Sequence, residues 1–485
     1  PWPLPVEATE EAGWSLEAGA TDKGAVDLPA CGFPVTRRCM SVVWRVGVFC
    51  VLGLLLEPHA MSQECLPGEG MATLVSPEHP VAGEEVRVLV ASDVGFASVA
   101  GELDQGPVTL TSQGGGPPYW AALRFLPETA GEHDLTVTMD DRRHCQSVTV
   151  AASPVPRQAT PTVWMATATW NRGYENLYAA WLEHLFGDAE GTAWPALHDL
   201  LRSRGRNLLH NHLALTEDSP DSKQALRLEP DCADNPYFLR AYFSWKLGLP
   251  FGFFQCDRGR RNRDPACSGW TTQQQPSGSK RPGRAFHLFL RKLKSAVHSG
   301  SARTALDAEV SDLYPVPLTP EALRPGTVFA DPYGHTLMLV RRLPQRDGSP
   351  GLLMAVDAQH DGTVTIKRFW RGNFLFASEE VIGGPGFKAF RPVVAKGGRY
   401  VPMSNAELSS SDEFPRLALD QQRMGPVDFY DAMARVVNPL PMRPEDAYRQ
   451  LHDALYEQVL TRVKAIANGE SWVARNPGKT IAMPK

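Results

Sequence analysis

The periodicity of apolar residues changes twice along this chain, and these changes restrict the fold more than any other feature of the sequence. Apolar and β-branched residues first fall in short alternating runs at Val86–Val90, Trp120–Phe125 and Leu135–Met139. Turn residues separate these runs at the spacing of a β-sandwich. We therefore expect residues 63–152 to form a small all-β sandwich. No catalytic residue pattern is visible in it, which favours a spacer or a binding module.

Residues 153–163 are rich in proline and poor in apolar residues, as expected of a linker. The apolar spacing then becomes helical, at i, i+3, i+4 and i+7. Three helices are predicted here, by Tyr178, Trp181, Leu182 and Leu185, by Leu197, Leu200, Leu201 and Leu208, and by the segment 236–247, which ends at Gly248.

From Gly326 onward the pattern is that of β-strands. The predicted strands are Thr327–Ala330, His335–Arg342, Leu352–Asp357 and Thr363–Trp370. Helices followed by strands indicate an α+β domain, which we place at residues 164–403. Residues 404–485 are predicted to be a helical extension whose main helix, Pro444–Ala467, ends at Asn468-Gly469.

The N-terminal region is typical of an export signal. The first methionine is Met40, and an uncharged apolar run, residues 46–56, follows Arg45. Eleven apolar residues are too few to cross a bilayer but suit a signal peptide, and Ala60-Met-Ser62 suits cleavage before Gln63. We expect residues 1–39 to be untranslated or unstructured and 40–62 to be a signal peptide; a buried helix or a short anchor is the alternative. The mature protein would be periplasmic or extracellular, without stable membrane insertion.

Composition and motif content exclude several classes of function. The 485 residues carry a net charge of −5, so no basic field is available to attract nucleic acid. The sequence contains no H-E-x-x-H, G-x-S-x-G or P-loop motif. Cys256 and Cys267 lack the spacing of a zinc site. We expect neither a metal nor another cofactor, and no nucleic-acid partner.

The number and spacing of the cysteines predict one free thiol. Of eight cysteines, five follow the predicted signal peptide, so at least one should be unpaired in an oxidising compartment. Cys256 and Cys267 bracket a turn-rich loop, and Cys65 and Cys145 bracket the β domain, so both pairs suit disulfides. Cys232 is then left as a free thiol.

The surroundings of Cys232 favour reactivity. It lies in Asp231-Cys-Ala-Asp-Asn-Pro236, and because proline is tolerated only in the first turn of a helix, Cys232 should lie at or just before a helix N-terminus. The amides and dipole there favour a thiolate. A buried structural thiol is the alternative interpretation.

His335 is the best candidate for a base. It opens a predicted strand after the turn Asp331-Pro-Tyr-Gly334, and the residues that share its face of the strand are apolar. Asp357 ends the next strand, and Gln359 lies on the same face. Either side chain is placed to accept the second N–H of the imidazole, and the sequence leaves the choice between them open. A core histidine is the alternative for His335.

Together these segments resemble two known families. The Asp-Cys-Ala-Asp string before a helix, and Gly334-His335 opening a strand, are similar to motifs of the NlpC-type cell-wall cysteine peptidases, which are papain-like α+β enzymes. The region 63–152 resembles bacterial immunoglobulin-like modules.

The first resemblance implies a role for each candidate residue. Cys232 would be the nucleophile, His335 the base and Asp357 the orienting group, with helix N-terminal amides stabilising the oxyanion. It also implies hydrolysis of amide bonds in a peptide or peptidoglycan-like substrate. The alternative is a catalytically inactive papain-like envelope protein that binds cell-wall peptide or glycan.

Overall fold

The computed structural model describes residues 70–480, apart from 105, 190, 261, 347–348 and 378–382 and the side chains at 461 and 465. The predicted leader, the signal peptide and Cys65 lie outside the described residues. The described part is a mixed α/β structure with two large antiparallel sheets, in agreement with the expected α+β class.

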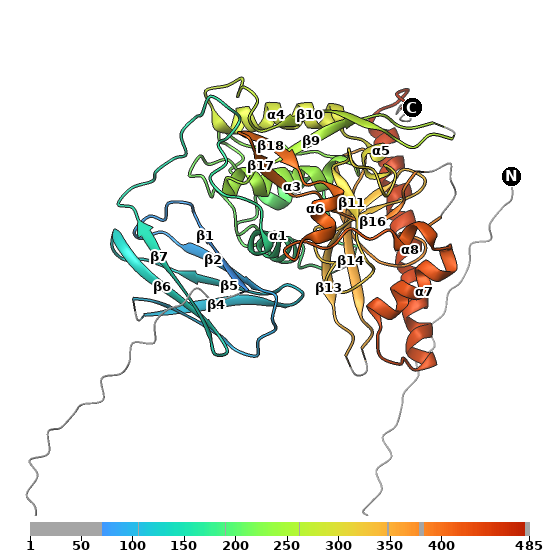
Figure 1. The fold of residues 1–485 in the computed structure, drawn as a ribbon, viewed down its shortest axis with the longest axis horizontal. Coiled ribbons are helices and arrows are strands. Elements are labelled where there is room, and N and C mark those ends of the chain that lie inside the picture. The colour runs from blue at the N-terminus through green and yellow to red at the C-terminus, as the bar shows by residue number, and fades with distance from the viewer. Residues whose placement is uncertain are drawn as a thin grey trace, which may run out of the picture. The chain divides into compact units, whose positions relative to one another are not determined.

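Seven strands make up the N-terminal part (Figure 1). They are β1 (Met71–Ser76), β2 (Val86–Ser92), β3 (Val99–Leu103), β4 (Gly106–Gly115), β5 (Tyr119–Phe125), β6 (Gly131–Met139) and β7 (Arg142–Val150). Their hydrogen-bonded order is β1-β2-β5-β4-β3-β6-β7. Strand β4 pairs with β3 near its start and with β5 over the rest of its length, so it connects the two halves of the sandwich. The three strands predicted from alternation correspond to β2, β5 and β6.

Strand β2 is buried on both faces, which alternation alone does not reveal. Val86, Val88 and Val90 point into the sandwich core together with residues of β5, β6 and β7. Leu89 and Ala91, on the opposite face, belong to the core of the following domain. The N-terminal strands therefore have a core of their own and also contribute side chains to the core of the following domain.

The remaining elements build the second part, beginning with α1 (Arg172–Leu185). The other helices are α2 (Leu197–Leu201), α3 (Asp234–Leu247), α4 (Pro282–Ala296), α5 (Ser299–Ala302), α6 (Asn405–Ser410), α7 (Pro426–Val437) and α8 (Pro444–Arg475), with a 3-10 turn, η1 (Asp420–Arg423). The main sheet contains β8 (Ala193–Trp194), β11 (Leu313–Pro315), β12 (Val328–Ala330), β13 (Thr336–Leu343), β14 (Leu352–Ala358), β15 (Val364–Arg368) and β16 (Gly386–Phe390). Two hairpins complete the structure, β9 (Gly252–Cys256) with β10 (Cys267–Thr272) and β17 (Val393–Lys396) with β18 (Arg399–Pro402).

The main sheet has the order β11-β16-β12-β13-β14-β15-β8 and is antiparallel throughout. Its two faces carry different clusters of buried side chains. Met338 and Val340 of β13 pack in the cluster that contains α1 and α3, whereas Leu337 and Leu339 pack with α7. The strands predicted at Thr327–Ala330, His335–Arg342, Leu352–Asp357 and Thr363–Trp370 correspond to β12 to β15, with small differences at their ends.

Helix α3 ends where the sequence predicts but is buried more completely than a surface helix. Gly248 follows it with φ 63°, a left-handed conformation that glycine adopts without strain. All residues of α3 except the last are buried, including Arg240 and Lys246. Each buried cation has acidic partners: Glu175 binds Arg240, and Glu217 and Asp218 bind Lys246. Helix α3 is therefore the central helix of the domain.

Two helix predictions were wrong in extent. Helix α2 ends at Leu201, because the side chain of Asn207 folds back to donate to the Leu201 carbonyl, and Leu208 lies in the following turns. Helix α8 continues through Asn468-Gly469 to Arg475. Glycine inside a helix costs only about 1 kcal/mol relative to alanine, so a helix that continues on both sides can include it.

One of the two expected disulfides and the free thiol are confirmed. Cys256 and Cys267 form a disulfide that joins β9 to β10. Cys145 is also disulfide-bonded, whereas its expected partner, Cys65, lies outside the described residues. Cys232 is a free thiol. Within residues 70–480, as far as they are described, no helix is long and apolar enough to cross a membrane.

Candidate functional site

Cys232 lies two residues before α3, in the place that the proline argument predicts. The side chain of Asp231, directly before it, accepts hydrogen bonds from the amides of Ala233 (3.0 Å) and Asp234 (3.1 Å). Asp231 thus binds the amides of the turn that leads into α3. Two of the amides expected to stabilise an oxyanion are therefore already engaged, and the Cys232 amide is the one that Asp231 leaves available.

A tight turn fixes His335 at the start of β13. Gly334 has φ 101°, and its amide donates to the carbonyl of Asp331 at 3.2 Å. The Asp331 carboxylate accepts a hydrogen bond from the Tyr333 amide at 2.6 Å, and the Asp331 amide donates to the His335 carbonyl at 2.9 Å. A side chain at Gly334 would be strained at this φ, so the turn requires glycine there. The imidazole is partly exposed beyond the sheet.

The imidazole of His335 contacts both other candidate residues. Its Nε2–H donates to Asp357 Oδ2 over 2.8 Å, and the Cys232 side chain lies near enough to help raise the pKa of the ring. The structure thus brings together the three residues predicted from the sequence, which lie just before α3, just before β13 and within β14.

The open choice between Asp357 and Gln359 is decided by these contacts. Asp357 touches the imidazole, whereas Gln359 donates its side-chain N–H to Asp357 Oδ2 over 3.0 Å. Asp357 is fully buried at the end of β14, where its carboxylate would be strongly destabilised without partners. Gln359 therefore supports the carboxylate and does not replace it.

Lys367 is the residue of this cluster that the sequence analysis missed. Its ammonium group lies against the same oxygen, Asp357 Oδ2. It comes from β15, which pairs with β14 so that Thr365 is opposite Asp357 and Lys367 is two positions along. In the sequence of β15, the polar residues Thr365 and Lys367 alternate with the apolar residues Val364 and Ile366, and this alternation was the only sign that Lys367 faces the site. Its meaning depends on strand register, which the sequence does not specify.

The charges of the cluster are mutually stabilising. Burial opposes the charged forms of both His335 and Asp357. For His335, hydrogen bonds to Asp357 and Cys232 outweigh burial and raise the pKa from 6.5 to about 9. For Asp357, the His335 hydrogen bond and the nearby Lys367 charge likewise outweigh burial and lower the pKa. At neutral pH the pair is therefore an imidazolium and a carboxylate. The contribution of His335 to stability is lost as the pH rises from about 6.5 through about 9, whereas that of Asp357 is lost as the pH falls below 3.8.

Replacing Lys367 with methionine should raise the pKa of His335 further, above about 9. The ammonium group neutralises part of the carboxylate charge that holds the proton on the imidazole, and it also repels the imidazolium. An NMR titration of the His335 ring measures the midpoint. Lys396→Met, which breaks the exposed pair with Glu407, is the control and should leave the midpoint unchanged. A midpoint in Lys367→Met that stays the same or falls would contradict this electrostatic account.

A second carboxylate beside the thiol is also perturbed. Asp234, in the first turn of α3, is buried, and burial together with the neighbouring Asp231 charge raises its pKa to about 7. Lys294 of α4 lies 3.9 Å away and counteracts part of this effect. Among the described residues no group of three or more His, Cys, Asp and Glu side chains is arranged to hold a metal ion.

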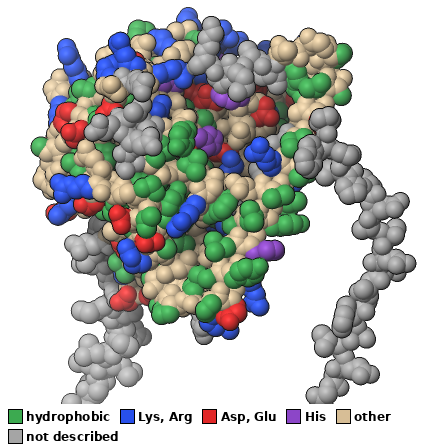
Figure 2. Space-filling model, turned by 90° about the vertical axis from the view of Figure 1, so that its right-hand side faces the viewer, with side chains coloured by type: hydrophobic (Ala, Val, Ile, Leu, Met, Phe, Trp, Pro, Cys, Tyr) green, Lys and Arg blue, Asp and Glu red, His purple; other side chains and the backbone are tan. Residues whose placement is uncertain are grey.

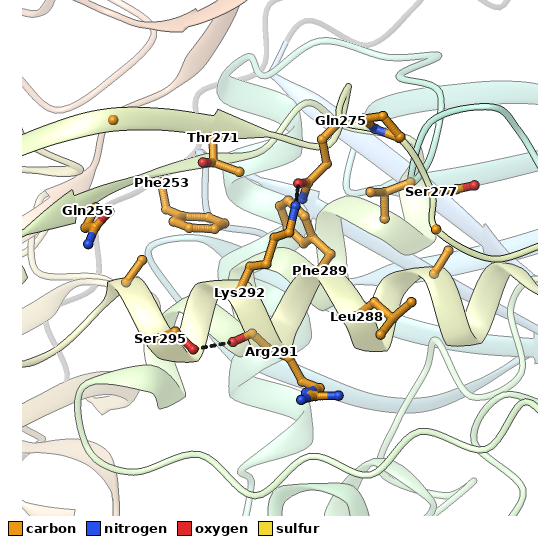
Figure 3. A pocket seen from close by; sticks show the side chains of 16 residues that line it. Phe253, Gln255, Thr271, Gln275, Ser277, Leu288, Phe289, Arg291, Lys292 and Ser295 are labelled. Atoms are coloured by element: carbon orange, nitrogen blue, oxygen red, sulfur yellow. Dashed lines mark hydrogen bonds between the residues drawn. The ribbon is translucent and has the colours of Figure 1, made fainter.

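A groove of about 620 Å³ lies elsewhere, between the β9–β10 hairpin and α4 (Figure 3). Figure 3 shows the rings of Phe253 and Phe289 between the two elements, and Lys292 reaching across to contact Gln275. None of the 16 lining residues belongs to the Cys232–His335–Asp357 cluster. The groove and the cluster are therefore separate features of the structure.

Comparisons with known proteins add little. No family model matches this chain, and no curated protein matches it. Among solved structures, a polysaccharide lyase is similar over 37% of this chain and 31% of its own chain, with 12% sequence identity and a TM-score of 0.16. The similarity spans less than a third of that lyase and is too small to support an argument about fold or function. The functional interpretation therefore rests on the residues of this chain.

Proposed function

We propose that this protein is a cysteine peptidase or amidase that hydrolyses amide bonds with Cys232, His335 and Asp357. One observation carries the proposal: the imidazole of His335 hydrogen-bonds to a buried carboxylate, and a free thiol lies near enough to the ring to help raise its pKa. A nucleophile in contact with a base, which is itself oriented by a third group, is the arrangement that nucleophilic acyl transfer needs. The likeness of the surrounding motifs to papain-like NlpC-type peptidases agrees with this assignment.

The charge state of the site suits attack by sulfur. The His335 imidazolium lies beside Cys232, so a proton donor is present where the sulfur would attack. The thiolate would attack the carbonyl carbon of the substrate amide to form a C–S bond, and the carbonyl oxygen would become an oxyanion. The Cys232 amide is available to donate to that oxyanion, since the Asp231 carboxylate already occupies the next two amides.

His335 would then act first as an acid and later as a base. Its proton passes to the leaving amine as the C–N bond breaks, which leaves a thioester on Cys232. The neutral imidazole next takes a proton from water, and the resulting hydroxide attacks the thioester. The C–S bond breaks, the carboxylic acid leaves, and the starting pair of Cys232 thiolate and His335 imidazolium is regenerated. Because Nε2 is bound to Asp357, Nδ1 is the ring nitrogen left for these transfers. Asp357 holds the ring in place and stabilises its charge.

The proposed substrate is a peptide or peptidoglycan-like amide, and the proposed setting is the periplasm or the cell exterior. The apolar run after Arg45, the Cys256–Cys267 disulfide and the disulfide of Cys145 agree with export into an oxidising compartment. The likeness to cell-wall peptidases supports the substrate class.

Thiol alkylation tests the activation step without a known substrate. At pH 6, iodoacetamide should label Cys232 at least about tenfold faster in the wild-type protein than in His335→Ala, because the imidazolium that favours the thiolate is lost. Peptide mapping by mass spectrometry assigns the label to Cys232, and Cys232→Ser shows the background.

His360→Ala provides a matched control, since His360 is exposed and lies just beyond Gln359. Labelling in this variant should equal that of the wild type. Equal labelling rates in wild type and His335→Ala would show that the imidazole does not activate the thiol. The inactive binding protein would then be the better explanation.

A further inference from the structure

The long C-terminal helix, α8, exposes an apolar stripe along most of its length. Most of its exposed large apolar side chains are three, four or seven residues from another, so they lie on one broad side of the helix. They are Tyr448, Leu451, Leu455, Tyr456, Val459, Leu460, Val463, Ile466 and Val473. Single exposed apolar residues are common on protein surfaces, but a continuous stripe indicates an interaction surface.

The opposite side of α8 is already in use within the chain. Ala454 is buried, and Glu457 accepts a hydrogen bond of 2.9 Å from the guanidinium of Arg368, at the end of β15. Figure 1 shows α8 beside α7 at the outer side of the second part, and Figure 2 shows apolar side chains (green) running down the face on that side. One side of helix α8 thus packs against the domain, and the other side is exposed to solvent.

The charges along α8 divide the helix into two unlike halves. Glu445, Asp446 and Asp453 give the N-terminal half an acidic character, and Arg462, Lys464 and Arg475 give the C-terminal half a basic one. Arg449 and Glu470 are the exceptions. The helix dipole favours such charges only in the first and last turns, so it does not account for Asp453, Arg462 and Lys464 in the middle.

An antiparallel pair of α8 helices accounts for both the exposed apolar stripe and the division of charge along the helix. Two copies related by a two-fold axis near Val459 would place the acidic half of each helix opposite the basic half of the other. Their apolar stripes would then meet along the whole helix. A helix of 32 residues is about 48 Å long and about 10 Å wide, so two such faces bury on the order of 1,000 Å², the lower limit for a specific interface.

We propose that the α8 stripe is a dimer interface, which a second copy of this chain covers in an antiparallel arrangement. Sedimentation equilibrium at micromolar concentration should give the mass of a dimer for the wild type. Val459→Glu places a charge at the centre of the stripe and should give a monomer. Asn468→Glu adds the same charge on the exposed, opposite side of the same helix and should remain dimeric.

Disulfide trapping distinguishes the two possible directions. In a Cys232→Ser background, Val459→Cys should cross-link two copies because the residue lies near the two-fold axis. Val473→Cys should not, because an antiparallel pair separates the two copies of residue 473 by most of the helix. Cross-links are assigned by peptide mapping, and equal cross-linking at both positions would indicate a parallel pair and overturn the arrangement.

Two further results would overturn the proposal itself. One is a wild-type protein that stays monomeric throughout the concentration range. The other is a Val459→Glu variant that stays dimeric. Sedimentation with vesicles containing anionic lipid identifies the alternative: a monomer whose binding is lost in Val459→Glu would use the stripe as a membrane-surface helix.

Discussion

Replacing Cys232 with serine should reduce amide hydrolysis at least about a thousandfold, because the three residues of such a cluster act as a unit and removal of the nucleophile removes the covalent route. The assay measures release of free amines from solubilised muropeptides and from a panel of small peptide amides. The variant should unfold at the same temperature as the wild type, since the thiol is only partly buried and serine is slightly smaller. A loss of hydrolysis without a change in unfolding temperature can then be assigned to the missing nucleophile and not to misfolding.

Two variants of neighbouring residues sharpen this test. Asp231→Asn keeps a side chain able to cap α3, and Asp357→Asn keeps the shape of the third residue but removes its charge. We expect Asp231→Asn to retain most of the activity and Asp357→Asn to lose most of it, because only the second change alters the charge that holds the imidazolium. If Cys232→Ser hydrolysed the same amides at the wild-type rate, the proposed chemistry would be wrong.

Replacing Lys246 with methionine should lower the free energy of unfolding by about 3–5 kcal/mol, the usual effect of removing one partner of a fully buried ion pair. Lys246 is completely buried, with its ammonium 2.5 Å from Glu217 Oε1 and 2.7 Å from Asp218 Oδ2. Methionine fills much of the same volume, so the loss comes mainly from the two carboxyl groups left without their cation. Urea denaturation of the full chain provides the measurement.

The remaining carboxyl groups explain why this loss is large. Burial, with a further contribution from the Glu217 charge, raises the pKa of Asp218 even while Lys246 is present. Asp218 also accepts hydrogen bonds from the Asn211 amide (2.8 Å) and the Tyr242 hydroxyl (3.0 Å), so its position is fixed and it cannot turn toward water. Lys294→Met is the matched control, because Lys294 is half exposed and 3.9 Å from its partner. Its loss should be below about 1 kcal/mol. Equal losses in the two variants would contradict the account.

Local rules predicted the parts of the fold whose signals lie within a few residues of one another. Pro236 and Gly248 mark the two ends of α3, and short apolar runs mark β13 and β14. Cys232 and His335 lie directly before two of these elements and Asp357 lies in the third, so local signals indicated all three residues. The left-handed conformation of Gly248 and the turn at Gly334 are local as well.

The missed features depend on contacts between distant segments. Asp357 and Gln359 lie on one face of the same strand, and only the position of His335 shows which of them reaches the imidazole. Lys367 joins the site through the register of β15 on β14. Helix α2 stops short because Asn207 bonds back to its last turn, whereas α8 continues past Gly469 because one glycine is a small penalty in a helix of 32 residues.

The shared core of the N-terminal strands and α1 has a consequence for how the molecule can be divided. Arg87 of β2 is buried and donates to the carbonyls of Asn207 (3.2 Å) and His210 (2.6 Å), and Trp120 of β5 packs in the same cluster as Trp181 of α1. A cut at the proline-rich segment would therefore open a hydrophobic interior to water on both products. The proline-rich segment is a boundary in amino-acid composition, but the parts on either side of it are expected to unfold together. They should therefore melt in a single transition.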